Sequence, residues 1–116
     1  MVVYNGSMTT SGLYQKKIQM ISEGFQEINP EKILLFGSAS SGNINKDSDI
    51  DICVVINTND SLKTKQQLKN IIWDNAIGFE PEIDIHVYSP SVYADRLKRH
   101  DPFISEISKG KILYER

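Results

Sequence analysis

The sequence lacks the features that mark secreted, membrane-spanning and DNA-binding chains. It has a single cysteine, Cys53, in an apolar run, so no internal disulfide can form and a reducing compartment, the cytoplasm, is expected. No apolar run approaches the roughly 20 residues of a membrane helix, and residues 1–12 lack the segments of a signal peptide. The net charge of -2 gives no electrostatic footprint for DNA. We therefore expect no membrane partner and no direct contact with nucleic acid.

The remaining composition is that of one ordinary globular domain. With 116 residues, 40% of them hydrophobic and 24% charged, the chain can bury one core but has no room for a separate substrate domain. Residues 1–12 are polar and rich in glycine, serine and threonine, which predicts a flexible lead before a single domain over residues 13–116.

Apolar periodicity, caps and breakers divide the chain into helices and strands. Helices are expected over residues 13–28 and 61–77, from Pro90, and from Pro102 to near Gly110, with a short helical turn over 38–42. Strands are expected over residues 32–36, 49–56, 82–88 and 111–114. The connections include both a crossover helix and a short loop between strands, so the predicted fold is α/β (α+β), with a small mixed sheet flanked by helices.

Three carboxylates fall inside the predicted strands. Asp49 and Asp51 lie one residue apart, so strand alternation points both to one face, and Asp84 lies between isoleucines in the third strand. Carboxylates in buried strands are costly unless they bind a metal or a charge partner. We expect them to converge on Mg²⁺, with two ions about 3.5–4 Å apart bridged by Asp49 and Asp51. Asp84 would hold the metal near an attacking hydroxyl and help remove its proton.

A Gly-Ser pair follows the first predicted strand, and ten residues, 39–48, separate it from Asp49. Gly37 lets the backbone approach phosphates closely, and Ser38 adds a hydroxyl donor. A lone Asp-x-Asp is more often a loop or cap feature, and Gly-Ser pairs occur at many turns. Their occurrence together, with a third carboxylate downstream, predicts a site that holds Mg²⁺ against a nucleoside triphosphate.

These motifs resemble a known signature. Leu35-Phe36-Gly37-Ser38 followed by Ser48-Asp49-Ile50-Asp51 resembles that of the DNA polymerase beta-like nucleotidyltransferase superfamily, and the short length resembles its minimal nucleotidyltransferase (MNT) branch. The resemblance covers roughly residues 13–116 and includes the segments 82–88 and 102–114. It implies a nucleotidyltransferase fold, with Mg²⁺ bound by Asp49, Asp51 and Asp84 and ATP bound near Gly37, Ser38 and Ser48.

The resemblance also implies a partner and a reaction. Proteins of the MNT branch are commonly paired with a HEPN-domain toxin, and members transfer AMP from ATP to a tyrosine of that ribonuclease to silence it. The expected activity is therefore that of a protein adenylyltransferase acting as an antitoxin. Two alternatives stay open: transfer to a small molecule or an RNA end, and a non-catalytic antitoxin that neutralises its partner by binding.

Two details qualify the predicted site. Members of the superfamily often carry an arginine just after the Gly-Ser pair, whereas here the first basic residue is Lys46. Triphosphate binding could be weaker, or Lys46 or a partner could supply the charge. His86 shares the face of Asp84 in the strand pattern, and we expect it at the rim of the site rather than on the metal.

Overall fold

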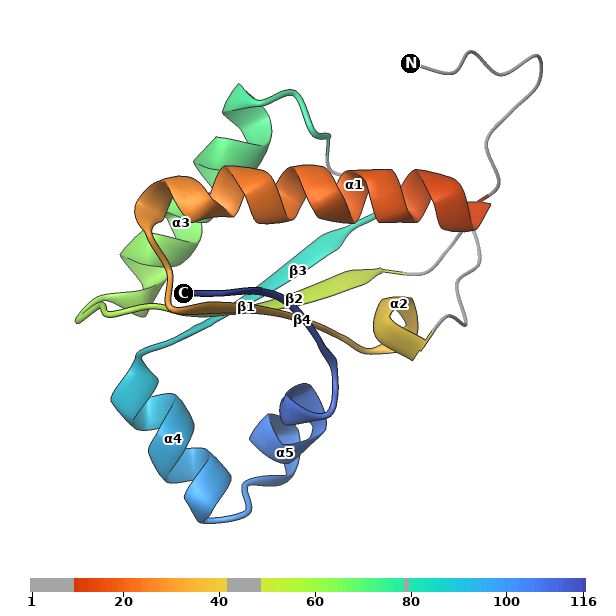
Figure 1. The fold of residues 1–116 in the computed structure, drawn as a ribbon. Coiled ribbons are helices and arrows are strands. Elements are labelled where there is room, and N and C mark those ends of the chain that lie inside the picture. Colours follow the sequence, from red (N-terminus) through yellow and green to blue (C-terminus); the bar gives the residue numbers. More distant parts are fainter. Residues whose placement is uncertain (1–9, 42–48, 79) are drawn as a thin grey trace, which may run out of the picture.

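The computed structural model describes residues 10–41, 49–78 and 80–116 and contains a four-stranded sheet with helices on both faces (Figure 1). Its helices are α1 Thr10–Phe25, the 3-10 turn η1 Gln26–Ile28, α2 Ser38–Ser41, α3 Ser61–Asp74, α4 Pro90–Lys98 and α5 Pro102–Ser108. Its strands are β1 Lys32–Phe36, β2 Ile50–Val55, β3 Ile83–Tyr88 and β4 Lys111–Glu115. The predicted α/β class and the order of elements are confirmed.

The sheet is mixed, as the sequence predicts. The strand order is β3-β2-β1-β4, with β1 antiparallel to both β2 and β4 and with β2 parallel to β3. The parallel pair is joined through α3, because a parallel connection must return the chain to the same end of the sheet. This topology places the beginnings of β2 and β3 at the end of the sheet where β1 finishes.

Two apolar clusters fill the two sides of the sheet. Helices α1 and α3 cover one face, and α4 and α5 cover the other (Figure 1). Along β2, Ile50 and Ile52 belong to the α1 side, whereas Cys53 and Val55 belong to the α4–α5 side. The strict alternation of a strand thus supplies residues to both clusters, and Cys53 is a core residue.

Both capped prolines begin helices where the sequence predicts them. The Ser89 hydroxyl accepts a hydrogen bond from the Val92 amide at 3.3 Å, ahead of α4. Asp101 Oδ1 accepts from the amides of Phe103 at 2.9 Å and Ile104 at 3.1 Å, ahead of α5. These caps satisfy amides that have no partner within the helix.

Some helices begin or end at other residues than the sequence predicts. Helix α1 begins at Thr10 rather than at residue 13, and its last predicted turn is the 3-10 turn η1. Helix α3 ends at Asp74, where the Asn75 side chain donates to the Ile71 carbonyl at 2.8 Å. Ala76, inside the helix predicted over residues 61–77, lies beyond its end, exposed and with a φ of 53°, so that predicted boundary is wrong. The predicted loop 43–48 lies outside the described residues.

A buried lysine ties α1 to the segment that leads into β3. Lys17 Nζ donates to the Glu80 carbonyl at 2.6 Å and to the Pro81 carbonyl at 3.3 Å. Desolvation lowers the pKa of Lys17, and the nearby Glu80 carboxylate partly opposes that effect. In the part of the chain that the structure describes, no helix is long and apolar enough to cross a membrane.

Candidate active site

Three strands place neighbouring residues at one end of the sheet. Asp51 on β2 lies opposite Phe36 on β1 and opposite Asp84 on β3. The Ile50 amide donates to the Glu82 carbonyl at 2.8 Å, which holds the beginnings of β2 and β3 together. Residues paired across strands point to the same face, so the two carboxylates lie side by side on the α4–α5 face. The sequence predicted this placement.

Asp51 is the most perturbed of the site carboxylates. Its partial burial raises its pKa above the ordinary value, and the charges of Asp84 and Asp49 raise it further, while His86 acts weakly in the opposite direction. Asp49 directly precedes β2 and is exposed, and the Asp84 side chain is 55% exposed. Three carboxylates therefore act on one another at the open end of the sheet, an arrangement that a hard divalent cation would relieve.

The Gly-Ser turn lies directly against this carboxylate. Gly37 has a φ of 72°, a conformation that glycine adopts freely. A Cβ at Gly37 would collide with Asp51 Oδ2 and lie 3.3 Å from Asp51 Cγ. The Ser40 amide and hydroxyl both donate to the Gly37 carbonyl, at 3.2 and 2.9 Å, and so start α2. The turn thus brings main chain next to Asp51 where any other residue would place a side chain.

The structure brings some predicted site residues together and leaves others apart. Gly37, Asp51 and Asp84 share one end of the sheet, Asp49 is close enough to raise the pKa of Asp51, and Ser38 is exposed at the start of α2. Ser48 lies outside the described residues. Within residues 10–41, 49–78 and 80–116, no three His, Cys, Asp or Glu side chains form a group that could hold a metal ion as they stand. Metal binding by the three carboxylates stays a prediction, supported by their oxygen chemistry.

An aromatic group that the sequence did not reveal borders the carboxylates. The His86 ring lies 5.1 Å from the Phe103 ring and 5.5 Å from the Phe36 ring, and Phe36 and Phe103 are 5.8 Å apart, measured between centroids. His86 Nε2 is 3.7 Å from Asp84 Oδ2, so His86 lies at the rim of the site, where it was expected. Phe103 was missed because its position depends on how α5 packs on the sheet, which no local pattern encodes.

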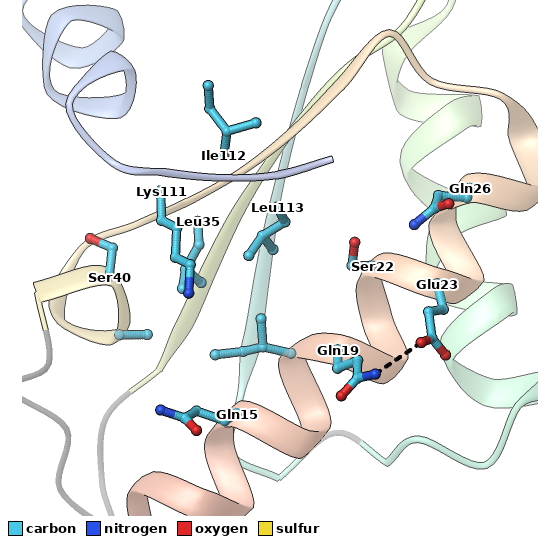
Figure 2. A pocket seen from close by; sticks show the side chains of 12 residues that line it. Gln15, Gln19, Ser22, Glu23, Gln26, Leu35, Ser40, Lys111, Ile112 and Leu113 are labelled. Carbon is cyan, nitrogen blue, oxygen red and sulfur yellow. Dashed lines mark hydrogen bonds between the residues drawn. The ribbon is translucent and has the colours of Figure 1, made fainter. Parts of the chain in front are cut away.

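A separate cavity of about 620 Å³ opens on the opposite face of the sheet (Figure 2). Gln15 and Gln19 of α1, Ser40 of α2 and Lys111 of β4 surround an apolar floor that includes Leu35, and Gln19 donates to Glu23 at 3.1 Å. None of the described residues predicted for the nucleotide site lines it.

This arrangement, a mixed sheet with a Gly-Ser turn beside paired strand carboxylates, is that of a nucleotidyl-transferring domain. The nucleotidyltransferase domain family matches residues 18–114, and the chain belongs to that family. Among solved structures, the fold is similar to that of a candidate nucleotidyltransferase from Sulfolobus solfataricus. The two share 18% identity with a TM-score of 0.54, over 96% of this chain and 100% of the other. No curated protein matches the chain in sequence.

The family match supports the general chemistry of the domain. The match to residues 18–114 covers β1, β2, β3, most of β4 and the described carboxylates, so the matched domain includes the carboxylate end of the sheet. Membership supports a nucleotidyl transfer activity, and domains of this family generally use a nucleoside triphosphate and a divalent metal. The acceptor and the biological partner are separate questions.

Proposed function

We propose that this chain is a cytoplasmic, Mg²⁺-dependent protein adenylyltransferase that transfers AMP from ATP to a tyrosine of a HEPN-domain toxin and so acts as its antitoxin. The observation that supports the catalytic part is the pairing of Asp51 with Asp84 across β2 and β3, next to the Gly37 turn. The partner and the tyrosine rest on the resemblance of the sequence to the MNT branch.

The position of each site residue in the fold supports its proposed role. The turn at Gly37 and Ser38 would hold the phosphates, because its main chain lies open beside Asp51 without an intervening side chain. Asp84 lies on β3, the edge strand of the sheet, with its side chain more than half exposed. It would therefore meet the acceptor hydroxyl and accept its proton. The acceptor oxygen bonds to the α-phosphorus, the bond from that phosphorus to the bridging oxygen breaks, and pyrophosphate leaves.

The carboxylates also fit a metal by the chemistry of their donors. Asp49, Asp51 and Asp84 offer hard oxygen ligands, and the pKa of Asp51 is raised first by burial and then by the charges of Asp84 and Asp49. Mg²⁺ bound there would neutralise phosphate charge and lower the pKa of the attacking hydroxyl. The chain's own contribution is to place these side chains and the phosphate turn at one end of a rigid sheet.

A macromolecular acceptor suits the open form of this site. The described residues form a single sheet with one helical layer on each face (Figure 1), and the Asp84 side chain, on the edge strand β3, is 55% exposed. A protein partner that docks at this edge could present a tyrosine hydroxyl directly. A small-molecule acceptor would need walls that a second protomer or a partner must supply.

Neutralisation of a toxin in cells tests the proposal. A HEPN-domain ribonuclease would be co-expressed with the native chain, with an Asp49→Asn and Asp51→Asn double variant, or with Asp74→Asn as a matched control at the exposed end of α3. The proposal expects growth with the native chain and the control, and growth arrest with the double variant at equal protein level. Growth with the double variant would instead show neutralisation by binding alone.

A further inference from the structure

We infer that Phe103, supported by Phe36 and His86, is the platform on which the base of the bound nucleoside triphosphate stacks. The inference rests on the proposed function, since it takes a nucleoside triphosphate as the ligand of the carboxylate site. It adds a base-binding residue that lies on neither of the two strands that carry the carboxylates. The argument starts from how α5 presents this ring.

Phe103 is held at the start of α5 with much of its ring uncovered. The Asp101 carboxylate accepts from the Phe103 amide at 2.9 Å, and Pro102 begins the helix, so the first turn is fixed. The Phe103 ring makes edge contacts with two other rings, yet the residue is 42% exposed. A phenylalanine that served only the core would be expected to bury more of its apolar surface.

The ring lies next to the carboxylates along the sheet. Phe36 is in register with Asp51, and His86 follows Asp84 by two residues on the same face, a rise of about 7 Å along the strand. Phe103 contacts both Phe36 and His86. The platform therefore begins level with Asp51 on β1 and reaches one strand repeat inward on β3, on the face that the carboxylates share.

The nucleotide is a better occupant of this platform than the acceptor. Phe36 directly precedes Gly37, so the platform borders the turn that would hold the phosphates of the same molecule. Asp84 lies on the edge strand, which leaves the acceptor an approach from outside the sheet. In a nucleotide, one ribose separates the base from the α-phosphate. The base should therefore bind next to the phosphate site, which is where the platform lies.

Stacking on this platform would tolerate any base. Aromatic side chains stack on the π-face that every nucleobase has, and alanine substitution of such a residue weakens binding about tenfold or more. His86 Nε2 is directed at Asp84, 3.7 Å away, rather than at a base edge. We expect ATP, GTP, CTP and UTP to bind with similar affinity and inorganic tripolyphosphate to bind more weakly than any of them.

Calorimetric titration in the presence of Mg²⁺ tests the inference on the whole chain. The ligands are ATP and tripolyphosphate, and the variants are Phe103→Leu, which keeps apolar packing but removes the ring, and Phe103→Trp, which keeps a ring. Trp73→Ala is the control, because Trp73 is an exposed aromatic residue of α3 on the other face. We expect Phe103→Leu to weaken ATP binding about tenfold, and both Phe103→Trp and the control to bind ATP like the native chain.

The outcomes separate this inference from the proposed function. Tripolyphosphate should bind all four proteins equally, and equal ATP affinity in the native chain and Phe103→Leu would overturn the platform while leaving nucleotide binding intact. Normal ATP binding with slower transfer in Phe103→Leu would assign the ring to the acceptor, which also overturns the inference. Failure of the native chain to bind either ligand would overturn the proposed function and the platform with it.

Discussion

Gly37 lies in the turn after β1 at a place where a Cβ would collide with the carboxylate of Asp51. Replacing Gly37 with alanine should therefore act on the site as well as on the backbone. The strained φ should cost about 1–2 kcal/mol of stability, and displacement of Asp51 should lower nucleotidyl transfer about 100-fold. Urea unfolding and a transfer assay on the same preparation would measure the two effects.

A second glycine provides the matched control. Gly78 has a φ of 86°, close to the 72° of Gly37, but a Cβ there would meet nothing within 4 Å. Gly78→Ala should therefore lose similar stability and keep its activity. Equal losses of activity in both variants would show that backbone strain, rather than the contact with Asp51, explains the requirement for glycine.

Asp51→Asn should stabilise the metal-free protein near neutral pH. The pKa of Asp51 is raised by burial and by Asp84 and Asp49, so the folded state favours the protonated form. Its contribution to stability is fully present below the unfolded pKa of about 3.9 and is lost as the pH rises through the folded pKa. In EDTA, Asp51→Asn should melt higher than the native chain at pH 7, and the difference should shrink toward pH 4. A lower melting temperature at pH 7 would contradict a repulsive carboxylate cluster.

Mg²⁺ should reverse this order of stability. If the carboxylates bind Mg²⁺ in the folded state, a concentration ten times Kd adds about 1.4 kcal/mol to the free energy of unfolding. The native chain should gain this stabilisation, and Asp51→Asn should lose most of it. Differential scanning fluorimetry over a range of MgCl₂ concentrations, with Asp74→Asn as the control, would show whether the gain depends on Asp51. An equal gain in all three proteins would indicate a nonspecific salt effect.

Cys53 should be inert while the chain is folded. It is fully buried, and desolvation raises the pKa of its thiol to about 12, so almost no reactive thiolate is present at pH 8. A thiol reagent such as DTNB should react with the unfolded chain and only negligibly with the native one. Rapid labelling of the native protein at pH 8 would mean that the α4–α5 side of the sheet opens readily.

The sequence predicts structural features that depend on neighbouring residues in the chain, but not those that depend on contacts between distant segments. Alternation along β2 and β3 correctly predicts that Asp51 and Asp84 share one face and that Ile50 and Ile52 fill the core. The burial of Lys17 could not be predicted, because the Glu80 and Pro81 carbonyls that it contacts lie more than 60 residues away.

The surroundings of Phe103 and of Gly37 could not be predicted from the sequence for the same reason. The cap at Asp101 predicts where α5 begins, but only the packing of α5 against the sheet brings Phe103 to Phe36 and His86. The sequence predicts a phosphate-binding role for Gly37, and its close approach to Asp51 depends on the pairing register of β1 and β2. Long-range packing therefore decides the details that distinguish a motif from a site.

The most direct measurement is transfer of label from ATP radioactive at its α-phosphate, with Mg²⁺, to a purified HEPN-domain partner. The native chain should label the partner protein and release unlabelled pyrophosphate, and Asp51→Asn should do neither while keeping its fold. Label on the partner that is unchanged in Asp51→Asn, or no label on any protein despite ATP binding, would contradict protein adenylylation by the carboxylate site.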